Sequence, residues 1–249
     1  MHQFNLKKYF FVLIIFVFHS TFAQTVTKVN PFNKIIISPN IQVTFIAGNE
    51  ESVAIEKSTV SNDKIHIEVN DKTLRIYLDG QKDFPKNEKT YENGYKEKQP
   101  VYKGTVVIAT VTYKTLNDLS IRGEETQVCK SLLKGNKFRL KVYGESHVIF
   151  DDVNLDQLLA IMYGGGSLEI KSGTIKDQKY IAYGESTFNC FAIKNITTKI
   201  TAYGNAIFEI NASDAIKITA YGDAKLNYKG NAQINKGLNI GDVQIDKMD

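Results

Sequence analysis

The sequence predicts an all-β protein whose C-terminal half is a single-stranded, right-handed β-helix, or β-solenoid, with about 20 residues in each coil. Three observations favour this fold class. A Tyr-Gly pattern recurs at nearly constant spacing, and the residues after each glycine alternate between apolar and polar. No segment of useful length shows the apolar spacing of three and four residues that an amphipathic helix requires.

Five copies of the pattern define the repeat. Their glycines are spaced by 20, 20, 20 and 18 residues, at Gly144, Gly164, Gly184, Gly204 and Gly222. A weaker copy begins at Arg122. The second, fourth and sixth residues after each glycine are small or apolar, as in Ala206, Phe208 and Ile210, which predicts a strand with one buried face. A second alternating strand precedes each glycine, for example residues 200–203, and the glycine permits the bend between the two.

Two short strands and a turn within 20 residues fit one coil of a β-helix, with coils about 4.8 Å apart. A β-propeller blade needs about 40 residues and four strands, and a β-sandwich does not require a repeating sequence. We therefore assign residues 119–249 to the repeat solenoid.

The preceding part, residues 24–118, also predicts strands, at 41–45, 64–69 and 105–113 among others. From 79 to 104 the chain is polar, rich in Lys and Glu, and contains two prolines. We expect a long, mobile surface loop there.

The first 23 residues predict a signal peptide. Lys7 and Lys8 precede an apolar run of about ten residues, and small side chains precede a cleavage site after Ala23. The mature protein is then expected in the periplasm, at the outer membrane or outside the cell. An uncleaved membrane anchor is the alternative. No later segment is apolar for the roughly 20 residues that a membrane-spanning helix needs, so we expect no transmembrane span after cleavage.

Charge and side-chain chemistry exclude several functions. Cleavage removes two lysines and no acidic residue, so the net charge falls from +4 to +2. A charge this small does not indicate the basic surface by which proteins bind nucleic acid. His66 and His147 remain, neither with a partner at metal-ligand spacing.

Cys129 and Cys190 are three coils apart, about 14 Å, whereas a disulfide tolerates Cα separations up to about 7 Å. We therefore predict two unpaired core thiols.

The tyrosines before the repeat glycines are the candidate ligand-binding residues. They are out of phase with the inward residues, which predicts an exterior ladder formed by Tyr143, Tyr163, Tyr183, Tyr203 and Tyr221. Exposed aromatic rings can stack on sugars or on another protein. The alternative is a structural ladder in which each ring shields its neighbour.

An acidic column runs beside the tyrosines, at Glu124, Glu145, Glu185 and Asp223. Such carboxylates could bind Ca²⁺ or act as the pair of a glycosidase. However, Glu145 and Glu185 are two coils apart, about 9.6 Å, without an evident basic partner. We expect a solvated acidic face, and we predict no catalytic residue, metal site or cofactor.

Taken in order, several segments resemble a known family. They are residues 29–48, 72–77 and 116–123, the repeated glycine turns, and the closing segment from 226. Together they resemble the autotransporter adhesin head domain called the head GIN domain, over nearly the whole mature chain. The resemblance implies an exported or surface-associated, solenoid-like protein of Bacteroidetes-type bacteria, with adhesion as its role and no established catalytic activity. The family usually carries Ser or Thr before the turn glycine, where this chain has Tyr.

The leading functional hypothesis is a non-enzymatic protein of the cell envelope or surface that contacts a glycan or a surface protein. A polysaccharide-active lyase or hydrolase on a β-helix is the second hypothesis, and a purely structural envelope component is the third. The sequence leaves the oligomeric state open.

Overall fold

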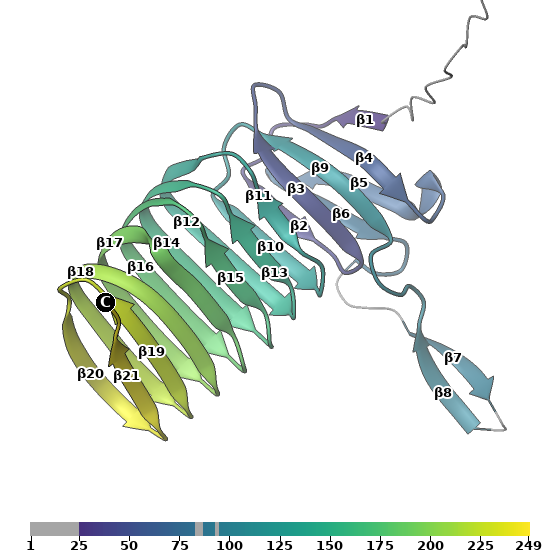
Figure 1. The fold of residues 1–249 in the computed structure, drawn as a ribbon. Helices are drawn as coiled ribbons and strands as arrows, with labels where there is room; N and C mark the ends of the chain where they lie inside the picture. Colours follow the sequence, from purple (N-terminus) through teal and green to yellow (C-terminus); the bar gives the residue numbers. More distant parts are fainter. Residues whose placement is uncertain (1–24, 83–86, 93–94) are drawn as a thin grey trace, which may run out of the picture.

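The computed structural model describes residues 25–82, 87–92 and 95–249, and it is a β-solenoid from which one hairpin projects (Figure 1). The expected signal peptide, residues 1–23, lies outside the described residues. Within the described ranges there is no α-helix, and the single 3₁₀ turn is η1, Asn62–Lys64. No helix in this part of the chain is long and apolar enough to cross a membrane.

Two stacks of parallel strands form the walls of the solenoid. We call the stack that carries the tyrosines the ladder sheet. It contains, in spatial order, β6 (Thr73–Leu78), β2 (Lys34–Ile37), β10 (Asp118–Gly123), β12 (Leu133–Gly144), β14 (Val153–Tyr163), β16 (Gly173–Tyr183), the second halves of β17 (Thr187–Tyr203) and β18 (Ala206–Tyr221), and β20 (Gln233–Ile240).

We call the other stack the opposite sheet. It contains β9 (Val107–Tyr113), β3 (Ile41–Ala47), β11 (Gln127–Cys129), β13 (His147–Phe150), β15 (Ser167–Ile170), the first halves of β17 and β18, β19 (Ala224–Lys229) and β21 (Val243–Lys247). Because β17 and β18 run without a break around the corner, they join the two stacks into one continuous sheet.

The register confirms the predicted coil length. Tyr143 pairs with Tyr163, and each later ladder tyrosine pairs with the next one along the chain. The turn glycines are aligned, since Gly123 pairs with Gly144 and the backbone of Gly144 contacts that of Gly164. Equivalent side chains about 20 residues apart in the sequence are therefore neighbours in space.

The first coils are not stacked in sequence order. The coil made of β2 and β3 lies between the strands β6 and β9 on one side and β10 and β11 on the other. Three antiparallel strands close this end: β5 (Ile65–Asn70) pairs with β6, β4 (Ser52–Ser58) pairs with β9, and β1 (Thr25–Lys28) pairs with β4. The N-terminal part thus supplies both a cap and the first two rungs.

The segment 79–104, expected to be a loop, contains a two-stranded antiparallel sheet. β7 (Asn87–Glu92) pairs with β8 (Tyr95–Pro100) in a hairpin that projects away from the solenoid (Figure 1). The expectation of a loop was wrong for these residues, because their backbones pair with each other as two strands. Residues 83–86 and 93–94 of this segment lie outside the described ranges.

The core fills the space between the two sheets. The predicted inward residues are buried, as in Val148 and Phe150 of β13 and Phe208 and Ile210 of β18. The fully buried Tyr180 has the small Ala160 on the preceding rung. The small side chain leaves room for the large ring, which allows close packing between these rungs.

Both cysteines are unpaired and buried, as predicted. The Tyr180 hydroxyl donates to the Cys190 thiol at 3.1 Å, and the Tyr113 hydroxyl lies 3.4 Å from the Cys129 sulfur. Burial raises the pKa of the Cys190 thiol to about 12 and also raises the pKa of Cys129. Both side chains are therefore protonated packing groups rather than nucleophiles.

Candidate ligand-binding surface

The ladder tyrosines stand at the ends of their strands, immediately before the turn glycines. Each of the five pairs across the sheet with its neighbour in the column, and each side chain has an exposed fraction of 36–40%. Inward neighbours such as Val142 and Met162 are buried. The pleat of the strand therefore turns every ladder tyrosine outward, as the sequence predicts.

The turn glycines keep this column straight. At the five repeat glycines the angle φ lies between +111° and +130°, a region that side chains with a Cβ rarely adopt. A Cβ placed on Gly164 would lie only 2.6 Å from the Gly144 carbonyl oxygen. The bend is thus identical from rung to rung, which places successive tyrosines in register.

The rings of the ladder stack on one another. Their centroids are separated by 4.8–5.1 Å, and the ring planes are within 5° of parallel. At one end the Arg122 guanidinium lies 5.9 Å from the Tyr143 ring centroid. Each inner ring face is consequently covered by its neighbour. The ladder presents ring edges and hydroxyl groups to solvent, so the expected stacking of sugars on ring faces does not fit the inner tyrosines.

None of the five ladder hydroxyls has a hydrogen-bond partner among the described residues. A phenol hydroxyl can both donate and accept. The column therefore offers a row of aligned hydrogen-bonding groups, about one rung apart, beside the apolar edges of the rings.

Comparison with known proteins identifies the family of this chain. Residues 31–232 match the family described as "Putative auto-transporter adhesin, head GIN domain". The chain belongs to this family. A comparison with curated proteins found no match.

Solved structures share the fold of this head GIN domain. A "putative adhesin" from Bacteroides fragilis has a TM-score of 0.76 at 18% identity, with 92% of this chain and 98% of that chain covered. A "putative lipid binding protein" from Parabacteroides distasonis has a TM-score of 0.64 at 18% identity, covering 91% and 96%. A "putative adhesin" from Parabacteroides merdae has a TM-score of 0.63 at 15% identity, with the same coverage. At sequence identities of 15–18%, the structural likeness establishes a shared fold alone.

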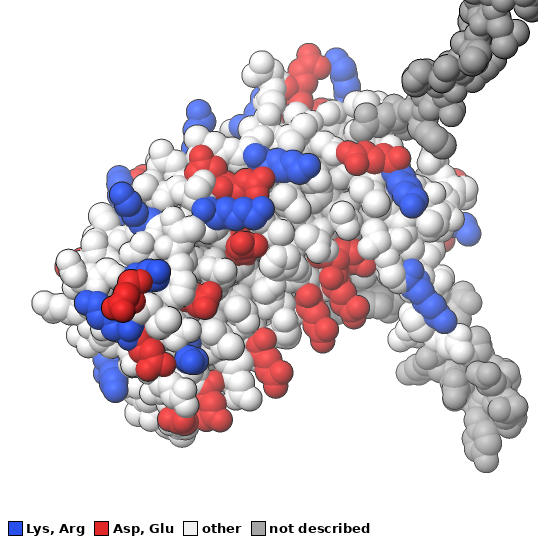
Figure 2. Space-filling view, viewed as in Figure 1, with Lys and Arg blue, Asp and Glu red and all other residues white. Residues whose placement is uncertain are grey.

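The acidic column of the head GIN domain follows the edge where the glycine turns lie. Figure 2 shows acidic side chains along the lower edge of the solenoid. Glu185 and Asp223 border a depression of about 540 Å³ with Asp242, whose backbone N–H donates to the Asp223 carboxylate at 3.0 Å. Asn205 lies between these acids in the column, and no group of three or more potential metal ligands occurs within the described residues.

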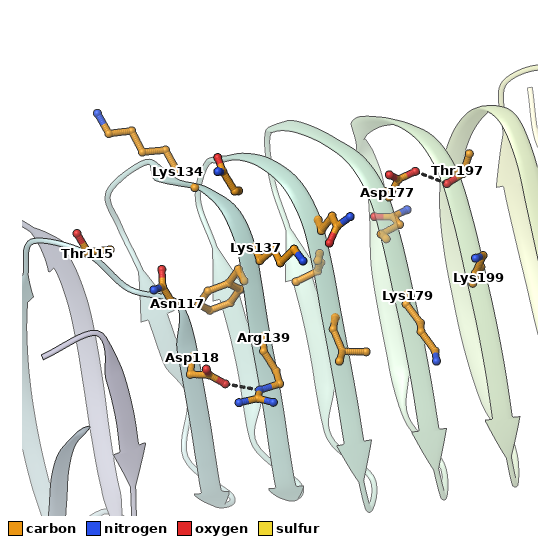
Figure 3. Close-up of a pocket in the computed structure, with 17 residues that line it drawn as sticks. Thr115, Asn117, Asp118, Lys134, Lys137, Arg139, Asp177, Lys179, Thr197 and Lys199 are labelled. Carbon is orange, nitrogen blue, oxygen red and sulfur yellow. Dashed lines mark hydrogen bonds and ion pairs between the residues drawn. The ribbon is translucent and has the colours of Figure 1, made fainter. Parts of the chain in front are cut away.

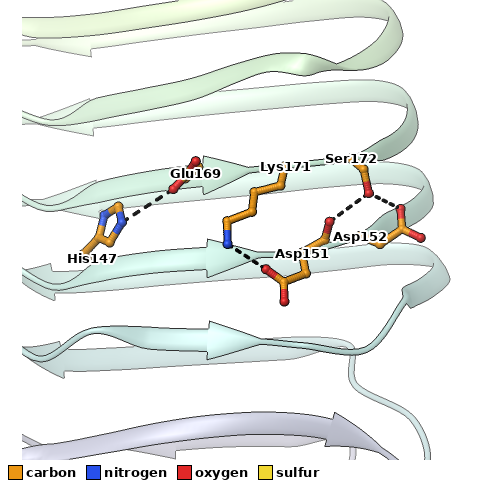
Figure 4. Close-up of polar contacts among 6 residues, drawn as sticks. All are labelled: His147, Asp151, Asp152, Glu169, Lys171 and Ser172. Carbon is orange, nitrogen blue, oxygen red and sulfur yellow. Dashed lines mark hydrogen bonds and ion pairs between the residues drawn. The ribbon is translucent and has the colours of Figure 1, made fainter.

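The structure brings together one polar cluster that sequence reasoning missed. On the opposite sheet, a ring nitrogen of His147 hydrogen-bonds the Ser167 hydroxyl. The other ring nitrogen lies 3.8 Å from the Glu169 carboxylate, a contact that Figure 4 shows. His147 and Ser167 are 20 residues apart, so the repeat itself could have revealed this contact. The cluster lies on an outward sheet face, and it lines neither the depression at Glu185 and Asp223 nor the groove at Lys179 and Lys199.

His66 lies elsewhere, at the capped end. Its ring stacks on Tyr77 with centroids 4.7 Å apart, and its Nε2 atom lies 3.6 Å from the Asp79 carboxylate. The two histidines that sequence analysis considered are thus on different strands, β5 and β13, in unrelated contacts.

Proposed function

We propose that this head GIN domain is an exported, non-enzymatic protein that binds a glycan or a protein of another surface through the outer face of the ladder sheet. The observation that carries the proposal is the column of five aligned, exposed tyrosines whose hydroxyls have no partner in the described chain. A purely structural ladder would need the stacked rings but not the hydroxyls, since phenylalanine stacks equally well.

The mechanism is multivalent contact along one axis. Each rung contributes one hydroxyl and one ring edge, and the rigid backbone register fixes their spacing. A ligand with a repeating structure can then form several weak contacts at once, and a single association event aligns all of them. Because the rungs are fixed before binding, little conformational entropy is lost from the protein.

Export follows from the N-terminal 23 residues read as a signal peptide and agrees with the adhesin description of the family. The absence of enzymatic activity is supported by the position of the His147, Ser167 and Glu169 cluster on an outward sheet face, outside the groove and the depression, and by the inert, buried thiols.

The test measures the contribution of the hydroxyls to binding separately from that of the rings. Changing Tyr163, Tyr183 and Tyr203 together to Phe keeps the stack and deletes three hydroxyls, whereas changing them to Ser also removes the rings. We expect the Phe variant to bind glycans or whole cells at least about tenfold more weakly than wild type, because it loses three hydrogen bonds worth about 0.5–1.5 kcal/mol each. The Ser variant should bind more weakly still.

The matched control lies on the opposite sheet of the same coils. Ser167, Thr187 and Ile207 form an outward column there, and all three can be changed to Ala. This control should bind like wild type. Equal binding by wild type and both tyrosine variants would reject the ladder as the contact surface, and a wild-type protein that binds neither glycan arrays nor cells would reject the proposed function.

A further inference from the structure

A row of cations runs along the ladder sheet, parallel to the tyrosines. Arg139 pairs across the sheet with Leu159, followed on successive rungs by Lys179, Lys199 and Lys217. All four charged side chains are exposed. Adjacent rungs are about 4.8 Å apart, so the last three positions bring like charges close together.

Arg139, Lys179 and Lys199 border a groove of about 1100 Å³ on the outer face of the ladder sheet, and Lys217 lies one rung beyond its lining (Figure 3). The groove crosses β12, β14, β16 and β17, and Leu159 forms part of its lining between Arg139 and Lys179. Lys134 and Lys137 also line it. The groove therefore runs along the solenoid axis, with cations from several rungs.

The acidic groups of the groove neutralise Arg139 but not the three lysines. Asp118 pairs with Arg139, and Asp177 accepts a hydrogen bond from the Thr197 hydroxyl at 2.5 Å (Figure 3). Within the described residues Lys179, Lys199 and Lys217 form no ion pair, unlike Lys171 and Lys176 near the corner of the same coil. Like charges held one rung apart repel one another, and an anionic ligand would relieve that repulsion.

We propose that the groove binds an acidic polysaccharide laid along the solenoid axis, with its carboxylate or sulfate groups against Lys179 and Lys199 in the groove and against Lys217 on the next rung. This inference rests on the proposed function, because it names the ligand class of the same sheet face. The advance of a sugar chain per pyranose ring is close to the rise of one rung, so successive acidic sugars can meet successive lysines.

The tyrosine ladder favours a glycan over nucleic acid as the polyanion. Single-stranded nucleic acid binds to such surfaces by stacking bases on exposed aromatic faces. Here the inner ring faces are covered by neighbouring rings, and hydroxyls and ring edges remain. Four residues along a strand separate each lysine from the tyrosine of its rung, about 13 Å, so the two columns border one continuous face. That face offers ammonium groups and hydroxyls, which match the groups of an acidic sugar.

The experiment measures binding of the mature protein to polygalacturonate, with dextran as the neutral polysaccharide and single-stranded oligothymidylate as the other polyanion. We expect polygalacturonate to bind more tightly than either and its affinity to fall as salt is added. Changing Lys179, Lys199 and Lys217 together to Gln should weaken polygalacturonate binding roughly tenfold, since an exposed ion pair is worth about 0.2–1 kcal/mol.

The control variant carries the same change in charge elsewhere. Lys57, Lys64 and Lys130 are exposed, lie outside the groove and form no ion pair within the described chain. Their joint change to Gln should leave the affinity within about twofold of wild type, since surface charges this distant are largely screened. All six positions are exposed, so both variants are expected to fold, which their circular dichroism spectra check.

Three results would overturn the inference: equal binding by the two lysine variants, binding of dextran as tight as that of polygalacturonate, or oligothymidylate bound as tightly as polygalacturonate. If wild type binds cells or neutral glycans through the tyrosines but not polygalacturonate, the acidic ligand is wrong and the proposed function stands. If wild type binds no surface at all, both fail.

Discussion

Single residues set the shape of the turn. Each repeat glycine has a positive φ, and its α-carbon lies against the backbone of the glycine one rung away. A side chain at these positions would meet both a strained backbone and a neighbouring carbonyl oxygen. Gly165, the position after Gly164 in the same turn, has neither constraint, since the nearest atom to a Cβ there belongs to the Glu145 side chain at 3.6 Å.

We therefore expect Gly164→Ala to lower the free energy of unfolding by about 1–3 kcal/mol, the typical cost of a residue held in a disfavoured backbone region. Gly165→Ala, one position away in the same turn, should leave it within about 0.5 kcal/mol of wild type. Urea denaturation followed by circular dichroism measures both. A similar loss in the two variants would show that turn strain does not explain the glycine repeat.

Sequence periodicity predicted which side chains point inward or outward, because the alternation of a strand is a local property. It predicted the alignment of the ladder tyrosines for the same reason. It did not predict that their faces are covered, since ring orientation depends on the side-chain torsions adopted in the stack. The contact of His147 with Ser167 was missed although its 20-residue separation equals the repeat.

At the level of elements, the two ends of the solenoid differ. The N-terminal end is closed by the antiparallel strands β5, β4 and β1. At the other end, β20 and β21 pair on one side only within the described chain. Leu238 and Ile240 of β20 each have an exposed fraction of 60%, and the register of β20 with β18 shifts between Ile218 and Ala220. The last rung thus lacks half of the packing that inner rungs have.

Backbone amides of β20 and β21 should therefore exchange with solvent much faster than those of β14 and β16, because regions with little buried apolar surface open at low free energy. Hydrogen–deuterium exchange with mass spectrometry measures the amide exchange rates of both regions in one experiment. Protection in the last rung equal to that in β14 would mean that something outside the described contacts covers this end.

The order in which the strands stack could be predicted from the sequence only where the repeat is visible. Residues 119–249 carry a visible period, and their coils follow one another in sequence order. The coil of β2 and β3 has no such signature, and its place between β6 and β10 depends on pairing between residues far apart in the chain, such as Lys34 with Thr73 and with Asp118. The hairpin of β7 and β8 was missed because its polar composition favours a loop.

For the whole molecule, we expect each 20-residue repeat to be one interchangeable rung. In such a solenoid, stability is approximately the sum of the rungs and their nearest-neighbour contacts. The rung from Gly184 to Tyr203 is the best suited to removal: its inward Phe188, Ile200 and Ala202 pair across the sheet with residues of the same type on the next rung. After deletion Tyr183 would precede Gly204, which preserves the Tyr-Gly junction.

Thermal unfolding of this 20-residue deletion is the most direct measurement of that claim, with a deletion of ten residues, 184–193, as the control. We predict that the 20-residue deletion retains a β-sheet circular dichroism spectrum and a single cooperative transition, while the ten-residue deletion, which puts every later strand out of phase, loses both. If the 20-residue deletion unfolds like the ten-residue one, or if the two are equally well folded, the rungs are not the units of this structure.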